Sequence, residues 1–188
     1  TGAVAANGKV VLAALEIWRD DINAKGGLIG RPVELIYYDD QSNPANVPGI
    51  YTKLMSVDKV DLLIGPYATN MIAPAMPVVM QKGKVFIGLF GLAVNSEFKY
   101  PKYFAMIPSG PDPKPSFTKG FFDAAAAQSP KPTTVAVVAA DAEFANNACE
   151  GARAETRPGF DVISVNAPFM VGAVPGLSSM IFEPYVAW

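Results

Sequence analysis

The stretch VDLLIGPYATNMIAPAMPVVMQKGKVFIGLF, residues 60–90, reads as a strand, a helix and a second strand. Its two ends, 60–65 and 85–90, are short apolar runs typical of buried strands in a parallel sheet. The apolar spacing between them predicts a helix over 70–82. Because connections of only a few residues join these elements, the stretch indicates an α/β fold with a parallel sheet flanked by helices.

The same alternation continues on both sides of this stretch. Residues 9–24 carry an apolar helical face and are preceded by Asn7, which is available as an N-cap. The segment VELIYY, 33–38, is rich in β-branched and aromatic residues and predicts a strand. The proline-rich run 108–115 predicts a linker. Further helices are predicted near 46–58, 116–128 and 144–156, and further strands over 103–107, 134–140 and 161–165.

Composition excludes several classes of function. The chain has 188 residues, of which 51% are hydrophobic, and a net charge of -2, so it lacks the basic surface that nucleic acid or an anionic membrane requires. It contains no His, which removes the commonest general base and most transition-metal sites. Its single cysteine, Cys149, is more typical of a small buried hydrophobe than of a nucleophile. The apolar tail 168–188 is interrupted by proline and glycine, which argues against a membrane-spanning helix.

Ligands of open parallel sheets bind beyond the carboxyl ends of the strands. After the predicted strand 60–65, a Gly65-Pro66 turn would expose the N–H groups of the next helix, and Thr69 would add a hydroxyl donor. This combination suits a carboxylate. The alternative is that Thr69 or Asn70 is only a helix N-cap, worth about 1 kcal/mol.

Two later strand ends are also candidates for binding. The small-residue loop 91–95 allows close approach of a ligand to the backbone, although an ordinary turn would look the same. The run 141–144 places Phe144 and the carboxylates of Asp141 and Glu143 at the start of a helix. Without a partner nucleophile, these carboxylates are more typical of a solvated helix entry than of acid–base catalysis. No dinucleotide, P-loop or nucleophile-elbow motif occurs.

Several stretches together resemble a known family. They include INAKGGLIGR, residues 22–31, followed by the paired Asp39-Asp40, as well as DLLIGPYATNMIAPAMPVV and TVAVVAADAEFANNACEGAR. In this order they resemble the type I periplasmic binding proteins of the branched-chain amino acid group, the solute receptors of ABC importers. The resemblance extends over roughly residues 2–165.

The resemblance implies a fold of two flavodoxin-like α/β lobes, each a parallel sheet flanked by helices, that close over a small ligand. Compared with the family, this chain lacks the first strand and much of the second lobe. The implied domains are an N-terminal ligand-binding lobe over 1–108, and an incomplete second lobe with an atypical apolar tail over 109–188.

The resemblance also implies a set of ligand-binding residues. Thr69 falls where the family uses a hydroxyl for the ligand carboxylate, and Phe144 falls where an aromatic ring often stacks on the ligand. Leu92 departs from the hydroxyl that usually helps to hold an amino acid, so the pocket is more apolar than an amino acid requires. The full set of implied residues is Asn7, Tyr67, Ala68, Thr69, Asn70, Phe90, Gly91, Leu92 and Phe144.

These features predict a non-enzymatic substrate-binding component of an ABC importer, located in the periplasm and partnered by a membrane permease. The expected ligand is an amino acid or a small aromatic or aliphatic carboxylate, with no cofactor, metal or nucleic acid. Two alternatives stay open, namely a ligand-sensing domain of the same fold and, with less support, an α/β enzyme. We also expect self-association through exposed apolar surface unless the tail folds back.

Overall fold

The computed structural model of the chain describes residues 1–130, 132, 134–155, 161–167 and 185–187. These residues form alternating helices and strands, which group into two compact units. The first unit comprises residues 1–67, 71–89 and 98–105, and the second comprises 68–70, 90–97 and the chain from 106 onward. The predicted division at residue 108 stays a prediction.

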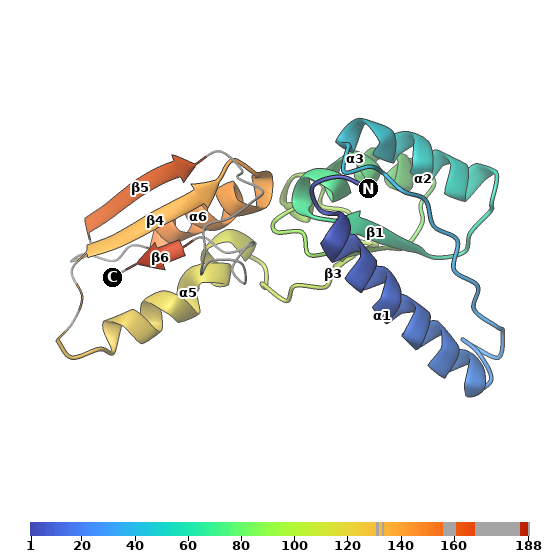
Figure 1. Cartoon of the computed structure of the whole chain (residues 1–188), viewed down its shortest axis with the longest axis horizontal. Coiled ribbons are helices and arrows are strands. Elements are labelled where there is room, and N and C mark those ends of the chain that lie inside the picture. Colours follow the sequence, from blue (N-terminus) through green and yellow to red (C-terminus); the bar gives the residue numbers. More distant parts are fainter. Residues whose placement is uncertain (131, 133, 156–160, 168–184, 188) are drawn as a thin grey trace. The chain divides into compact units, whose positions relative to one another are not determined.

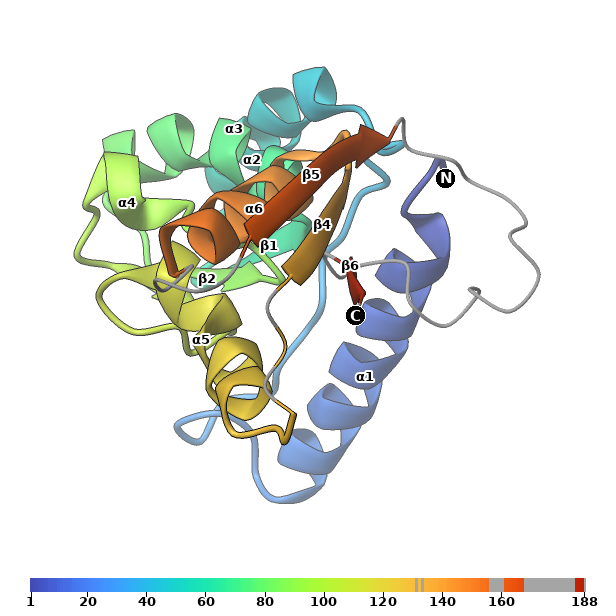
Figure 2. The ribbon, with the colours of Figure 1, turned by 90° about the vertical axis from the view of Figure 1, so that its left-hand side faces the viewer.

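The first unit is built around a three-stranded parallel sheet in the order β1-β2-β3. Helices α2 and α3 lie on one side of β1, and α1 lies on the other side (Figure 1 and Figure 2). The elements are α1 (Ala5–Ala24), a short 3-10 helix (Pro44–Asn46), α2 (Val47–Ser56), β1 (Leu63–Tyr67), α3 (Thr69–Gln81), β2 (Phe86–Leu89) and β3 (Tyr103–Ala105).

The two faces of this sheet differ in burial. The row Leu63, Phe86 and Tyr103 is buried, and the ring of Phe86 meets the ring of Tyr51 from α2 edge-on at 5.4 Å. The neighbouring row carries Ile87, 40% exposed, and Phe104, 56% exposed. Within the described residues, the face that carries Ile87 and Phe104 is the more exposed of the two, although α1 contacts β1 on that side (Figure 2).

Two sequence expectations in this unit are wrong. Residues 33–38 form no strand, because no described strand lies beside them to complete a ladder. Gly65 and Pro66 are not a turn but lie inside β1, which ends two residues later than expected. The chain reverses instead at Ala68, which adopts a left-handed φ of 87°.

The second unit contains a mixed three-stranded sheet in the order β5-β4-β6, where β4 runs parallel to β5 and antiparallel to β6. Helices α5 and α6 pack together, and α6 packs on β4. The elements are α4 (Asn95–Phe98), α5 (Pro113–Ala126), β4 (Thr134–Ala140), α6 (Glu143–Glu155), β5 (Asp161–Ala167) and β6 (Tyr185–Ala187).

The core of the second unit lies between α5, α6 and β4. Phe122 of α5, Val137 of β4 and Cys149 of α6 are each 1% exposed, so Cys149 is buried as predicted. Because α5 begins at Pro113, it takes in the end of the predicted linker. The short helix α4 was not predicted.

The expectations for the apolar tail mostly fall on 168–184 and 188, which lie outside the described residues. Only Tyr185–Ala187 is described there, as β6. Among the helices that the structure describes, none combines the length and the apolar character needed to cross a membrane.

Candidate ligand-binding site

The structure brings two predicted site residues, Thr69 and Leu92, into direct contact within the second unit. Thr69 is the first residue of α3, and its Oγ1 accepts a hydrogen bond from the backbone N–H of Leu92 at 3.0 Å. Both residues are fully buried, with 0% exposure. Since the hydroxyl accepts this bond with a lone pair, its own proton is still available for donation.

A side chain from α6 forms a second hydrogen bond to the backbone of Leu92. The amide Nδ2 of Asn147 donates to the carbonyl oxygen of Leu92 at 3.0 Å. Both backbone polar groups of Leu92 are therefore satisfied by side chains, one from the start of α3 and one from α6. Sequence reasoning missed Asn147, although it lies three residues after Phe144 and so belongs to the same helical face.

Phe144 stands at the first turn of α6 and is half-buried. Its ring meets the ring of Phe117 from α5 edge-to-face, with centroids 5.5 Å apart and planes at 89°. This is the arrangement that aromatic pairs prefer, so Phe144 is held in place by a neighbour of its own unit.

The backbone around Thr69 and Leu92 is strained at three points. Ala68, Phe90 and Ala93 have φ angles of 87°, 45° and 62°, in the left-handed region that non-glycine residues rarely adopt. Each such residue costs about 1–3 kcal/mol, and such costs are concentrated at binding and active sites. All three flank the two residues joined by the hydrogen bond from Leu92 to Thr69.

The other predicted residues divide between the two units. Gly91 and Ala68 are buried, Asn70 is exposed and Phe90 is 37% exposed, all in the second unit. Asn7 and Tyr67 belong to the first unit.

Asn7 does not cap α1, because the helix already begins at Ala5. Its side-chain amide instead donates to the hydroxyl of Tyr67 at 3.1 Å. Burial raises the pKa of Tyr67, and the bond from Asn7 opposes this increase.

Carboxylates surround the entry to α6. Burial and the nearby charge of Glu97 raise the pKa of Glu143, whereas Lys114 acts in the opposite direction. Glu143 directly precedes Phe144, and Glu97 lies on α4, which follows the Leu92 loop. The candidate site therefore has an acidic flank, which favours positive charge on a ligand there.

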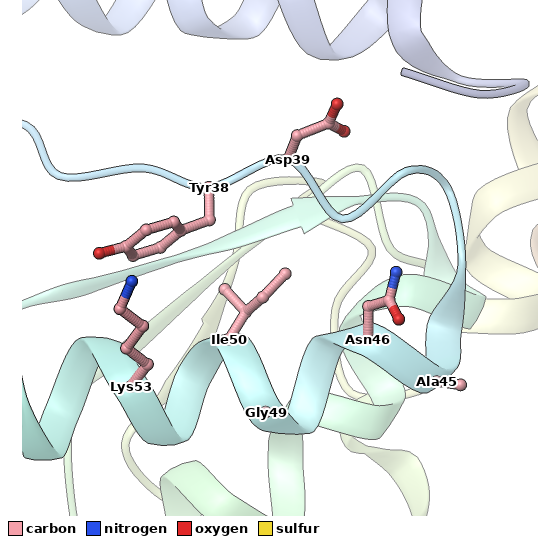
Figure 3. A pocket seen from close by; sticks show the side chains of 7 residues that line it. All are labelled: Tyr38, Asp39, Ala45, Asn46, Gly49, Ile50 and Lys53. Atoms are coloured by element: carbon pink, nitrogen blue, oxygen red, sulfur yellow. The ribbon is translucent and has the colours of Figure 1, made fainter.

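A separate open groove of about 480 Å³ lies in the first unit, between residues 38–39 and α2 (Figure 3). None of the predicted ligand residues lines it. Its two charged groups are already engaged, because the carboxylate of Asp39 accepts a hydrogen bond from the backbone N–H of Gln41 at 2.8 Å and the ammonium of Lys53 lies 4.0 Å from the centre of the Tyr38 ring.

In the described part of the chain, no group of three or more His, Cys, Asp or Glu side chains is placed to hold a metal ion. The polar groups that the second unit gathers are instead a hydroxyl, an amide, backbone N–H groups and carboxylates, which can recognise a small polar ligand by hydrogen bonding.

Comparison with known families gives one match over most of the chain. A family model described as a periplasmic binding protein matches residues 1–173. Over 87 residues, the chain is 30% identical to the Leu/Ile/Val-binding protein BraC3 of Rhizobium johnstonii and 29% identical to the Leu/Ile/Val-binding protein of Escherichia coli. Each alignment covers 46% of this chain and 23% of the relative.

Two solved structures share the fold over 96% of this chain. One is the branched-chain amino acid transporter substrate-binding protein LivJ of Streptococcus pneumoniae in complex with isoleucine, with a TM-score of 0.68 and 20% identity. The other is a solute-binding protein of an ABC transporter from Rhodopseudomonas palustris in complex with 3,4-dihydroxybenzoic acid, with a TM-score of 0.74 and 21% identity. This chain spans 51% and 48% of their lengths, which is about half.

Proposed function

Because this chain belongs to the periplasmic binding protein family, we propose that it forms the ligand-capturing part of a solute receptor that serves an ABC importer. The receptor works in the periplasm and passes its ligand to a membrane permease. The shared fold confirms the type I α/β architecture expected from the sequence. Among the relatives described above, none supports the alternative of a ligand-sensing domain.

The observation that carries the proposal is the bridge from Thr69 through Leu92 to Asn147. It joins the start of α3, a strand-end loop and α6 through one buried and one partly buried hydrogen bond. A ligand carboxylate placed at the start of α3 would accept bonds from free helix N–H groups and from the Thr69 hydroxyl proton. Phe144 then supplies apolar area from α6.

Capture in this scheme is a shift between two states of the second unit. In the first state, the bond from Asn147 to Leu92 holds α6 against the loop that carries Leu92. In the second state this bond is broken. A ligand that contacts both α6 and the loop would favour the first state. A ligand shifts such an equilibrium only by its difference in affinity for the two states. Docking on a permease would release the ligand by favouring the other state.

The acidic flank bears on the class of ligand. Leu92 offers an ammonium group no acceptor from its side chain, but Glu143 and Glu97 can compensate for a positive charge. An amino acid therefore gains an interaction there that a plain aromatic or aliphatic carboxylate does not. We propose an amino acid with an apolar side chain as the ligand, with small aromatic acids as the competing class.

The test is a thermal-shift screen of the chain against leucine, isoleucine, valine, phenylalanine and 3,4-dihydroxybenzoate. We expect a concentration-dependent rise in Tm for at least one of the amino acids, because a ligand that binds only the folded state stabilises it. Phe144→Ala should raise the ligand concentration that gives half of the Tm shift at least tenfold. Phe104→Ala, on the exposed face of the other unit, should leave this concentration unchanged.

A second variant separates the two ligand classes. Glu143→Gln should weaken the response to amino acids and leave any response to the aromatic acid unchanged. If only the aromatic acid raises Tm, the ligand class is wrong while the receptor proposal stands. The absence of any response across the screen would overturn the receptor proposal for this chain.

A further inference from the structure

We propose that the amino-terminal edge of the first unit's sheet is a docking surface for an acidic segment of a partner polypeptide. The proposal does not depend on the identity of the small-molecule ligand. Five side chains from three neighbouring loops make up this surface, the lysine platform. They are Lys59, Lys82, Lys84, Lys99 and Lys102.

The topology of the sheet brings the five lysines to one edge. One of them precedes β1, two precede β2 and two precede β3, each within four residues of the start of the strand. Because these strands are parallel and adjacent, their amino ends meet at the same edge of the sheet. Neighbouring strands lie about 4.8 Å apart, so the three strand starts span about 10 Å.

Hydrogen bonds to backbone carbonyls join the three loops. The ammonium of Lys84, before β2, donates to the carbonyl oxygen of Val60, before β1, at 3.0 Å. The ammonium of Lys102, before β3, donates to the carbonyl oxygen of Gly83, before β2, at 2.8 Å. Since an ammonium has three N–H donors, each of these lysines keeps two for other acceptors. The loops are thus tied to one another without exhausting the donors of the platform.

Charge is segregated on this part of the first unit. The chain as a whole has 17 acidic and 15 basic side chains, so its charges nearly balance. Residues 71–89 and 98–105, in contrast, contain four lysines and no Asp or Glu.

The carboxylates nearest to the platform in sequence are engaged elsewhere. Asp61 faces Arg31 at 3.7 Å, and Asp58 accepts a hydrogen bond from the hydroxyl of Tyr38 at 3.0 Å. Within the described residues, no carboxylate forms an ion pair with a lysine of the platform. The platform therefore presents positive charge that its own unit leaves unpaired.

Two lysines of the platform occupy strained backbone positions. Lys59 and Lys99 have φ angles of 55° and 49°, in the left-handed region that glycine adopts without penalty. Both side chains are exposed and have no bonding partner among the described residues, so no contact offsets this strain. Backbone strain is concentrated at functional sites, and here it accompanies a positive charge held at the surface.

A short acidic segment fits the platform better than a membrane surface does. The span of about 10 Å equals three extended residues at about 3.3 Å each, so such a segment can contact the lysines alone. An anionic bilayer is an extended surface. It would also meet the carboxylates of Asp58 and Asp61 and would repel a chain with a net charge of -2. Because exposed charges act mainly on encounter rate and partner choice, we expect a weak, salt-dependent complex.

The test titrates an acetylated and amidated hexaglutamate peptide into the full chain labelled with ¹⁵N, and follows the amide chemical shifts. We expect shifts in 59–62, 82–85 and 99–102 and none in α6. Raising NaCl from about 20 mM to about 150 mM should weaken binding roughly threefold or more, because salt screens exposed charges. A hexaglutamine peptide of the same length should leave the shifts unchanged.

A charge reversal on the platform has a matched control at the other end of the sheet. Lys82→Glu should lower the affinity for hexaglutamate roughly tenfold or more, because it replaces an attraction by a repulsion. Lys9 lies on α1, two residues after Asn7, whose amide contacts the hydroxyl of Tyr67 at the carboxyl end of β1. Lys9→Glu makes the same change of charge on the same unit and should alter the affinity less than about twofold.

A glycine variant separates binding from folding. Lys99→Gly removes a charge from the platform and places at a φ of 49° the residue that tolerates it best. The variant should bind hexaglutamate roughly threefold more weakly than the unmodified chain, with an equal or higher Tm. A loss of binding through misfolding would instead lower Tm.

Three results would overturn the proposal. The first is the absence of shifts in the platform loops at about 20 mM NaCl. The second is an equal loss of affinity in Lys82→Glu and Lys9→Glu, which would reveal only a general attraction between opposite charges. The third is sedimentation with phosphatidylglycerol vesicles that depends on Lys82 while hexaglutamate does not bind, which would assign the platform to a lipid surface.

Discussion

Leu92 contributes to the candidate site through its backbone. Its side chain is fully buried, while its N–H and C=O are bound by Thr69 and Asn147. The family resemblance implies a hydroxyl at this position, and Leu92 lacks it, but the two backbone hydrogen bonds still fix the loop. The loop position is set by residues 23 and 55 positions away in the chain, and no local pattern reveals such pairs.

The bond from Leu92 to Thr69 gives a prediction at the scale of one residue. Thr69→Val keeps the shape of the side chain and leaves the N–H of Leu92 buried without an acceptor, which should cost about 1–3 kcal/mol of unfolding free energy. Thr69→Ser keeps the acceptor and should cost less. Urea unfolding followed by circular dichroism measures the difference.

The matched control for this prediction is Thr52→Val. The hydroxyl of Thr52 is exposed on α2 and bonds only to the carbonyl of Pro48 in the preceding turn, so water can replace this contact. The change should alter the unfolding free energy by less than about 0.5 kcal/mol. Equal losses in Thr69→Val and Thr52→Val would contradict a structural role for the Thr69 hydroxyl.

Apolar runs located the strand ends near Thr69, Leu92 and Phe144, and the family resemblance implied that these residues bind the ligand. The structure places all three in one unit, and their binding roles stay predictions. Sequence reasoning missed Asn147 and misassigned Asn7 as a cap, since both amides bond to groups distant in the chain. Their roles depend on tertiary contacts rather than on local sequence.

At the scale of elements, the sequence located the strands that pair with a neighbour, but it wrongly predicted a strand at 33–38, where no described strand lies alongside. β4 was predicted at 134–140 and is observed there, paired with β5 along its whole length. The segment 33–38 has stronger β-forming residues but forms no strand. Strand preference is largely a preference for neighbours on a sheet, so composition alone cannot decide it.

The packing of α5 against α6 gives the second prediction. Gly151 of α6 lies directly against the carbonyl of Lys114 at the start of α5, and an added Cβ would overlap that carbonyl. Gly151→Ala should therefore push the helices apart and lower the unfolding free energy by about 1–3 kcal/mol. Thermal unfolding monitored at 222 nm measures the change.

Gly120→Ala provides an internal comparison on α5. A Cβ at Gly120 would meet nothing within 4 Å, so alanine should only improve helix formation and raise stability by about 0.5–1 kcal/mol. Opposite signs for the two glycine variants are the expected result. A stabilising effect of Gly151→Ala would show that the close approach of α5 and α6 is not needed.

At the scale of the whole molecule, one sheet face of the first unit carries exposed apolar residues. Half-buried Ile64 and exposed Ile87 and Phe104 occupy matching positions on three adjacent strands, opposite the buried row. Leu62, 55% exposed, precedes this row. On this side α1 contacts β1, but Ile87 of β2 and Phe104 of β3 are still largely exposed. Sequence periodicity predicted the strands but could not show which face would stay more exposed.

This face gives the last prediction, concentration-dependent self-association of the chain. Contiguous exposed apolar surface drives association because burial of each square ångström contributes roughly 25 cal/mol. The double variant Ile87→Lys and Phe104→Lys should shift the chain toward monomer in sedimentation velocity. Val57→Lys, which changes a 67% exposed residue just after α2, should leave association unchanged. A clean monomer at every concentration of the unmodified chain would contradict the prediction, and equal effects of both changes would place the contact elsewhere.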